Sequence, residues 1–253
     1  MPNHTSWLTF VLGYFEETLE HNAVAIGETL VNHDPATWRS FEPISAAVLV
    51  AALIVVLALL ARRQLLRDDA YLPEDRLTLR TFMEAFLGYF YDLAKSSMDA
   101  HRAKKYFPVI AASALFVFFS NVMALLPGMP VATSSLNVTL GSGLVVFVLF
   151  NIYGLMVNGW SYVKHLAGPA WYLAWLIFPI EVISLVVRPI TLGLRLMLNM
   201  AVDHLIVTIF LGLVAILVPV PLLLIGCIVV VIQTLVFTLL TTAYIALATE
   251  HEH

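Results

Sequence analysis

The sequence predicts an all-α integral membrane protein, and three observations support this fold class. Of the 253 residues, 60% are hydrophobic and only 12% are charged, whereas roughly a quarter of the residues in a soluble domain are charged. Apolar runs recur that are long enough to cross a bilayer as helices. Basic residues gather in one stretch, as they do on the cytoplasmic side of membrane proteins. Residues 1–253 contain no internal repeat or soluble segment, so we expect a single membrane domain.

The distribution of charge predicts the orientation. Segment 1–43 has six acidic residues and one basic residue, Arg39, and should lie outside. It lacks a basic n-region and a small-residue cleavage site, so we expect no cleaved signal peptide. The C-terminus should then lie in the cytoplasm. Nine of the thirteen lysines and arginines fall in one predicted cytoplasmic stretch: Arg62, Arg63, Arg67, Arg76, Arg80, Lys95, Arg102, Lys104 and Lys105.

The first span is expected at 44–61, where no residue is charged and the pair Arg62 and Arg63 stops transfer. A linker, 62–106, follows. Its pattern suits an amphipathic helix that lies in the membrane interface or packs on other protein. The apolar stripe of that helix consists of Phe82, Ala85, Phe86, Tyr89, Phe90 and Leu93.

Residues 107–157 should form a transmembrane hairpin of two spans, 107–126 and 136–157. The turn between them has no basic residue, so its tip should face outward. The loop after the hairpin returns Lys164 to the cytoplasm.

Two long tilted helices are expected in 171–249 and should form a second hairpin. Residues 171–218 would span roughly 72 Å as one straight helix, more than twice the hydrocarbon thickness, so this helix must tilt or bend. Pro179 and Pro189 are the expected bending points. The closing helix, 222–249, would be about 42 Å long and can also tilt.

The stretch TLGLRLMLNM places Arg195 within the first of these helices. An arginine near the bilayer centre costs at least about 2.5 to 3.5 kcal/mol, so it needs a partner or a way to water. At helical spacing, Arg195 belongs to a mostly polar stripe, and His204 lies beside its last member. The stripe consists of Glu181, Arg188, Leu192, Arg195, Asn199 and Asp203.

Plainer interpretations remain for these residues. If the helix stood upright, Arg195 would snorkel to the cytoplasmic headgroups. Arg188 would pair with Glu181 or reach headgroups, and Glu181 would either make that pair or line a proton path. In the last helix, Gln233 would hydrogen-bond a neighbouring helix.

Few other side chains suggest chemistry. Tyr244 and Thr241 lie near the face of Gln233, and the single cysteine, Cys227, is expected to be a small buried hydrophobe among apolar neighbours. The sequence has no nucleotide-binding loop, metal-ligand spacing or catalytic triad, so we expect no cofactor and no metal.

The segment SLVVRPITLGLRLMLNM, with His204 nine residues after Arg195, resembles subunit a of the F-type ATP synthase. In that family an essential arginine matches Arg195, and an asparagine four residues later matches Asn199. MALLPG with TSSLNVTL resembles the family's hairpin tip, and VIQTLVFTLLTTAYIALATE resembles its closing helix. The resemblance covers 77–253.

The resemblance implies a proton-translocating stator subunit in the bacterial inner membrane. Its partners would be a ring of small two-helix proteolipid subunits, the peripheral-stalk subunit b and the lipid bilayer, with no nucleic acid. Arg195 would separate two aqueous half-paths. One would run from outside past Asp203 and His204, with Glu181 as a further candidate, and the other from the cytoplasm near Gln233 and Tyr244.

The sequence differs from the family pattern at two positions, and the register of the last two helices is a further difficulty. Asp203 stands where the family often has glycine, and Gly226 stands where it often has an ionisable residue. Folding the last two helices about residues 218–221 also places Gln233 opposite Ile206, roughly 16 Å along the helix from Arg195. The family's proximity of arginine and glutamine therefore requires a bent or offset hairpin.

Two other functions compete with this one. A proton-coupled secondary transporter could bind a small anion on the polar stripe, but such transporters are built from repeats that this sequence lacks. A purely structural anchor would leave the cost of Asp203 inside the membrane unexplained.

Overall fold

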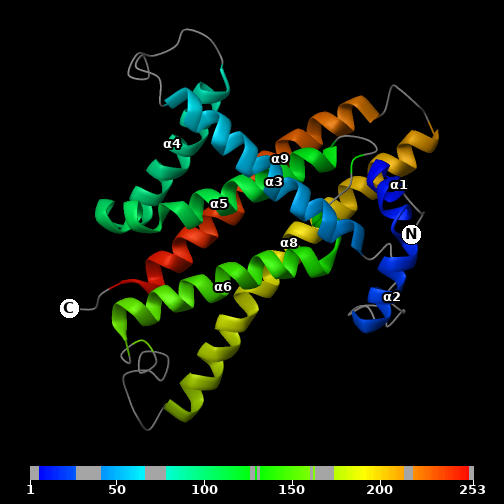
Figure 1. Ribbon diagram of the computed structural model, residues 1–253. Coiled ribbons are helices and arrows are strands. Elements are labelled where there is room, and N and C mark those ends of the chain that lie inside the picture. The colour runs from blue at the N-terminus through cyan, green and yellow to red at the C-terminus, as the bar shows by residue number, and fades with distance from the viewer. Residues whose placement is uncertain are drawn as a thin grey trace.

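The computed structural model describes residues 6–26, 41–65, 78–125, 129, 132–159, 162, 174–213 and 219–250. Lys164 and parts of both predicted outward turns lie outside this set. Within it, regular structure is entirely helical, which confirms the predicted fold class. Five helices are long and apolar enough to cross a membrane (Figure 1): α3 (Glu42–Leu65), α5 (Ala100–Leu125), α6 (Leu136–Asn158), α8 (Ala174–Leu213) and α9 (Pro219–Ala248).

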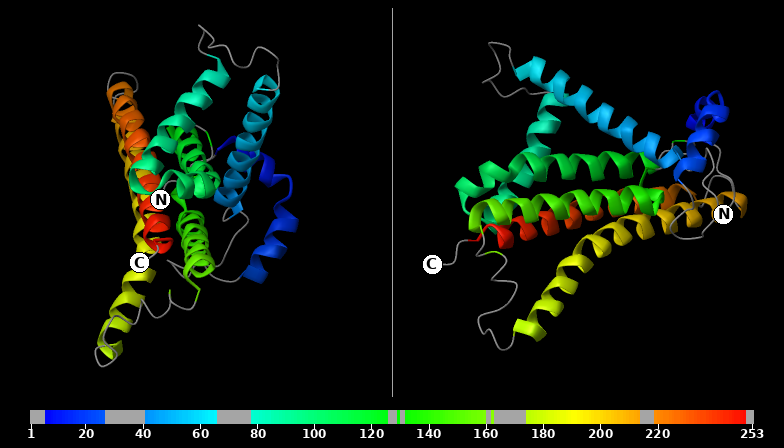
Figure 2. Two further views of the ribbon diagram at one scale, coloured as in Figure 1. Left: turned by 90° about the vertical axis from the view of Figure 1, so that its left-hand side faces the viewer. Right: turned by 60° about the horizontal axis from the view of Figure 1, so that its bottom comes forward.

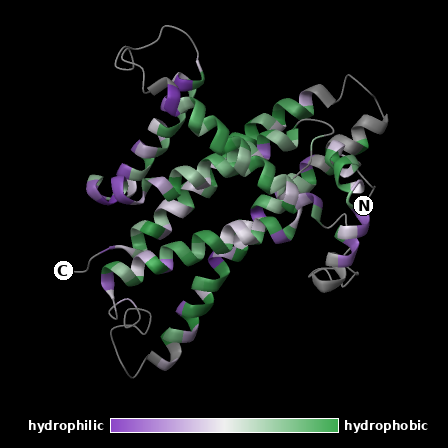
Figure 3. Ribbon diagram, viewed as in Figure 1, coloured by the Kyte–Doolittle hydropathy of each residue, from purple (hydrophilic) through white to green (hydrophobic). Residues whose placement is uncertain are grey.

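Shorter helices lie near the ends of the bundle. α1 (Trp7–Gly13) and α2 (Glu16–Ile26) lie at one end, and the C-terminal end of α9 lies at the other (Figure 1). Hydrophilic residues gather on α2 and at the ends of α4 (Leu79–Ser97), whereas the long helices are mostly hydrophobic (Figure 3). The short helix η2 (Ala132–Ser134) precedes α6.

The amphipathic helix predicted in the linker is α4, and it packs on protein. Thr78 caps its N-terminus by accepting a hydrogen bond from the Thr81 amide. Phe90 and Ala94 are buried, and the ring of Phe86 lies 5.0 Å from that of Phe118 in α5. Tyr89 stays 55% exposed. α4 therefore covers α5 with one face and leaves its other edge open.

The core of the bundle lies between α5, α6, α8 and α9, and its fully buried members include Ile110, Phe150, Leu196 and Ile245. α9 also contributes buried threonines whose hydroxyls donate to the carbonyl four residues earlier in the same helix. These threonines are Thr234, Thr238, Thr241, Thr242 and Thr249.

The C-terminal end of α9 is held by side chains from two other helices. Arg102 of α5 donates to the carbonyl of Thr249 at 3.2 Å. Asn158 of α6 donates to the carbonyls of Ala248 and Glu250 at 3.2 and 3.1 Å. The last carbonyls of a helix have no partner within that helix, and these contacts satisfy them. They also fix the position of the end of α9 relative to α5 and α6.

Two glycines let α6 and α8 approach closely. A Cβ added at Gly143 would lie 2.7 Å from the carbonyl oxygen of Pro189, and one added at Gly193 would lie 2.8 Å from that of Thr139. Backbone atoms cannot move aside as a flexible side chain can. Small residues at this crossing therefore let α8, the helix with the polar stripe, pack closely on α6, as in other membrane helix pairs.

The α8–α9 hairpin has an offset register. α8 is one continuous helix with prolines at 179 and 189, and Figure 2 shows that it bends along its length. The Asn199 amide donates to the side-chain oxygen of Gln233 at 2.8 Å. Gln233 therefore meets Asn199 and not Ile206, an offset of seven residues or about 10 Å. The hairpin is therefore bent and offset, as the proximity of arginine and glutamine in the family requires.

Cys227 is exposed, so the prediction that it is buried was also wrong. Its neighbour Gly226 is buried against Leu125, whereas Ile228 is 60% exposed. Apolar neighbours indicate burial only in a protein surrounded by water. In a membrane they cover the outer side of a helix equally well.

We expect Gly193→Ala to destabilise the fold by about 1–3 kcal/mol, the usual cost of overpacking, because its methyl group would press on the Thr139 carbonyl. The measurement is the apparent melting temperature of the protein in detergent. Gly141→Ala is the matched control, since nothing lies within 4 Å of an added Cβ there. Equal melting temperatures for the two variants would contradict the close crossing.

The hairpin register can be tested by cross-linking in a Cys227→Ser background. A short thiol-specific linker should join Asn199→Cys to Gln233→Cys, because the native side chains are hydrogen-bonded. The pair Ile206→Cys and Gln233→Cys should stay unlinked. Peptide mass spectrometry detects the product, and linking of only the second pair would restore the straight register.

Candidate functional site

Arg195 lies near the middle of α8, within the candidate span Ile177–Asp203. Its neighbours Leu192 and Leu196 are buried in the core, whereas Arg195 itself is exposed. No residue in the described part of the chain forms an ion pair with it. A guanidinium on the outer side of an apolar helix needs water or a group from another molecule. The described part of the chain supplies no such partner for Arg195.

Asn199 and Gln233 form the polar contact nearest to Arg195 along α8. Asn199 is one helical turn after Arg195 and half-buried, and Gln233 is buried. Their 2.8 Å hydrogen bond ties α8 to α9. The prediction that Gln233 bonds a neighbouring helix is confirmed, and the bond places Gln233 at the level of Asn199, one helical turn from Arg195.

A second polar group, the Tyr244 cluster, lies toward the C-terminal end of α9. It consists of Glu181, Arg188, Tyr244, Asn151 and Tyr162. The Arg188 guanidinium lies 3.9 Å from the Glu181 carboxylate and 5.3 Å from the centre of the Tyr244 ring. This confirms the predicted pairing of Arg188 with Glu181, and the ring contact adds a cation–π interaction. Glu181 therefore lies with Tyr244 and not with Asp203.

Tyr162 joins the Tyr244 cluster from the connection between α6 and α8. Its hydroxyl donates to Asn151 at 3.0 Å, and its ring covers Gly154, where an added Cβ would lie 2.8 Å away. Burial raises the pKa of the Tyr162 hydroxyl and outweighs the opposing effect of Arg188. The hydroxyl therefore keeps its proton at neutral pH. Sequence reasoning missed Tyr162 because it belongs to no helical stripe.

Asp203 lies on the opposite side of Arg195 from the Tyr244 cluster and is half-buried. His204 follows it in α8, but its side chain lies outside the described structure. Ala124, Met200 and Val230 pack in one cluster. Since Met200 is three residues before Asp203, this contact places Asp203 at the level of the C-terminal part of α5.

A further polar group, the Asn121 cluster, lies at that part of α5. It consists of Ser120 and Asn121 of α5 and Thr133 of η2. All three residues are at least 99% buried. The Thr133 hydroxyl donates to Asn121 at 3.5 Å, whereas the Ser120 hydroxyl and the Asn121 amide nitrogen have no hydrogen-bond partner among the described residues. Buried donors of this kind are usually satisfied by water. The SN dipeptide within an apolar run was the sequence signal for this cluster, and it was missed.

No group of three or more histidine, cysteine, aspartate or glutamate residues could hold a metal ion in the described part of the chain. The polar residues are instead spread along α8 in three groups. The Tyr244 cluster lies toward one end, Asp203 lies toward the other, and Arg195, Asn199 and Gln233 lie between them. Such an arrangement can bind and pass protons or ions, but it contains no nucleophile with a neighbouring base.

Known proteins are similar to this sequence over most of its length. The family model described as ATP synthase A chain matches residues 44–246. ATP synthase subunit a of Sorangium cellulosum (strain So ce56) is 57% identical over 251 residues, covering 99% of this chain and 98% of that protein. ATP synthase subunit a 1 of Syntrophotalea carbinolica (strain DSM 2380 / NBRC 103641 / GraBd1) is 40% identical over 249 residues, covering 98% and 96%.

ATP synthase subunit a of Bdellovibrio bacteriovorus (strain ATCC 15356 / DSM 50701 / NCIMB 9529 / HD100) is 40% identical over 187 residues, covering 74% of this chain and 81% of that protein. The matches extend the resemblance beyond residue 77 into the N-terminal part of the sequence. On the strength of a family model that spans all five candidate membrane helices and relatives that match nearly end to end, the chain belongs to the ATP synthase A chain family.

Proposed function

We propose that this protein is the proton-translocating stator subunit of a bacterial F-type ATP synthase. It is proposed to provide two aqueous half-paths and to present Arg195 to a rotating ring of small two-helix proteolipid subunits. Proton flow through these paths then drives rotation and ATP synthesis, since each elementary charge that crosses 100 mV releases about 2.3 kcal/mol. The peripheral-stalk subunit b is the proposed partner that holds the protein still against the ring.

The observation that supports this proposal best is the isolation of Arg195. Its guanidinium is exposed in the middle of a membrane span, and no described residue pairs with it. A partner that brings a carboxylate to this surface would satisfy the arginine. The ring of the proposed complex does so repeatedly, with a different subunit each time.

Arg195 would act by its permanent charge. A guanidinium close to a carboxylate favours the ionised form of that carboxylate, so a ring subunit loses its proton as it approaches. The positive charge also prevents a proton from passing directly between the half-paths. Lysine could not serve equally well, because a desolvated ammonium can lose its proton whereas guanidinium effectively cannot.

The outer half-path is proposed to pass Asp203 and His204 and to reach the Asn121 cluster. Asp203 supplies a titratable group. The unpaired Ser120 hydroxyl and Asn121 amide supply hydrogen-bonding sites for water at the same level of the bundle. Asn199 and Gln233 would then position the inner end of the path beside Arg195.

The cytoplasmic half-path is proposed to pass the Tyr244 cluster. The side chain of Glu181 is 43% exposed, so the carboxylate lies at the surface of the described chain. Arg188 holds this carboxylate close to the Tyr244 ring. Assigning Glu181 to this side gives each half-path one carboxylate.

Arg195→Ala should abolish ATP-driven proton pumping in inverted membrane vesicles while the complex still assembles, and Arg195→Lys should fail or nearly fail. Acidification is followed with a pH-sensitive dye. Leu198→Ala is the matched control, since Leu198 is also exposed on α8, and it should pump normally. Normal pumping by Arg195→Ala would favour the snorkelling interpretation.

Asp203→Asn should lower proton flux at every pH tested, because the outer path loses its carboxylate. Adding Gly226→Glu should restore part of the flux. A Cβ there would meet only the end of the flexible Leu125 side chain, which can move. Gly226→Gln in the same Asp203→Asn background is the control for bulk and should not rescue. Independent structural defects would add, whereas a shared path gives rescue. Unchanged flux in Asp203→Asn would remove Asp203 from the path.

A further inference from the structure

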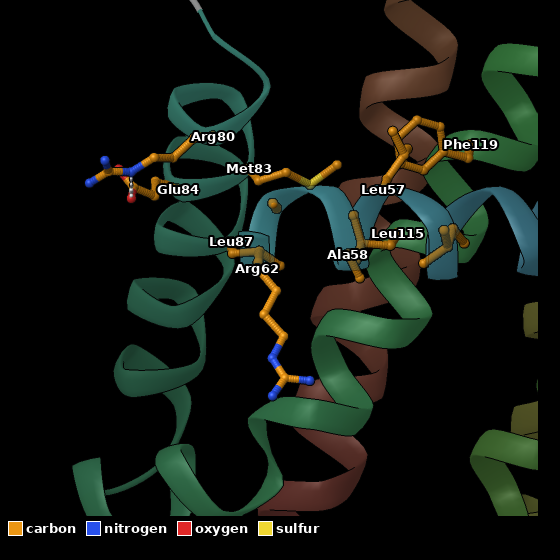
Figure 4. A pocket seen from close by; sticks show the side chains of 11 residues that line it. Leu57, Ala58, Arg62, Arg80, Met83, Glu84, Leu87, Leu115 and Phe119 are labelled. Atoms are coloured by element: carbon orange, nitrogen blue, oxygen red, sulfur yellow. Dashed lines mark hydrogen bonds and ion pairs between the residues drawn. The ribbon is translucent and has the colours of Figure 1, made fainter. Parts of the chain in front are cut away.

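The first span stands away from the bundle and leaves a cavity. α3 diverges from α5, and α4 closes the wide end of the wedge between them (Figure 2). A cavity of about 220 Å³ lies in this wedge. It is distinct from the polar residues of α8, because α3, α4 and α5 supply all of its lining (Figure 4): Ile54, Leu57, Ala58, Leu87, Leu115 and Phe119 form the walls.

The walls are hydrocarbon, and the charges lie at the rim. Arg62, Arg80 and Glu84 also line the cavity. Arg80 and Glu84 pair at 2.8 Å on α4. Arg62, at the end of α3, extends in another direction, and Figure 4 shows its guanidinium away from that pair. The exposed Arg62 forms no ion pair within the described part of the chain.

Two features determine what fits here. An apolar cavity of this size binds an apolar group and not water. One positive charge remains at the rim after Arg80 and Glu84 have paired. The occupant must therefore combine a hydrocarbon chain with an anionic head, at the membrane side where the basic residues gather.

We propose that the cavity binds one acyl chain of an anionic phospholipid from the cytoplasmic leaflet, with the lipid phosphate on Arg62. Basic pockets between membrane helices on the cytoplasmic side are typical sites for anionic headgroups. A helix from a partner subunit fits less well. With a diameter of about 10 Å, a helix is much wider than an acyl chain and too wide to enter a cavity of about 220 Å³.

The test uses the assembled complex, reconstituted in vesicles of equal parts phosphatidylglycerol and phosphatidylcholine. A diazirine amino acid of leucine size at position 115 forms adducts with whatever occupies the cavity. Mass spectrometry of the adducts should show a ratio of phosphatidylglycerol to phosphatidylcholine about fivefold higher than in the bilayer, as one surface arginine provides. Arg62→Gln should remove the enrichment.

Two further variants separate the role of Arg62 from a general effect of surface charge and locate the adduct in the cavity. Arg63→Gln is the matched control, because Arg63 is also exposed but does not line the cavity, and it should keep the enrichment. Ala58→Phe should fill the cavity and reduce adducts of both lipids. The proposal is overturned if the adduct is another protein subunit, if the lipids appear in their bulk ratio, or if Arg62→Gln and Arg63→Gln behave alike.

Discussion

The lipid interior offers no hydrogen-bond partner to a polar group, and the arrangement of this protein follows from that constraint. Each polar side chain within the spans must bond inside the chain, reach water or meet another molecule. Asn199 and Gln233 satisfy each other across two helices, and Arg188 lies between a carboxylate and an aromatic ring. Arg195 has neither solution within the described chain. The need to satisfy polar groups therefore explains both the contacts between helices and the requirement of Arg195 for water or another molecule.

The helices divide the protein into two sides with different roles. Viewed along the bundle, α5 and α6 lie between α3 on one side and α8 with α9 on the other (Figure 2, left). The proposed lipid site lies on the α3 side, and the exposed Arg195 belongs to the α8 side. On the α8 side, two glycines let α6 and α8 pack closely, and side chains of α5 and α6 bond the C-terminal end of α9. α3 is held mainly at its start, where Ser6 and Thr9 donate hydrogen bonds to Glu42.

Sequence reasoning identified the five spans, the amphipathic helix and the polar stripe, because length and periodicity determine these features locally. It left the register of α8 against α9 open between the straight hairpin that the turn suggests and the offset hairpin that the family resemblance requires. That register depends on a bend in a long helix, and a turn alone does not report it. Cys227 shows a second limit, since apolar neighbours do not distinguish a core from a lipid-facing side. Tyr162 and Asn121 show a third, because their roles come from contacts between distant segments.

The buried threonines of α9 have a consequence for energy conservation. A chain of hydroxyl groups can conduct protons when each one donates to the next, and five buried hydroxyls along one helix could provide such a chain. Here each hydroxyl donates to a backbone carbonyl of its own helix instead. These hydroxyls therefore do not link to one another, and they offer protons no chain along α9 beside the proposed half-paths. Protons that leaked there would dissipate the gradient without turning the ring.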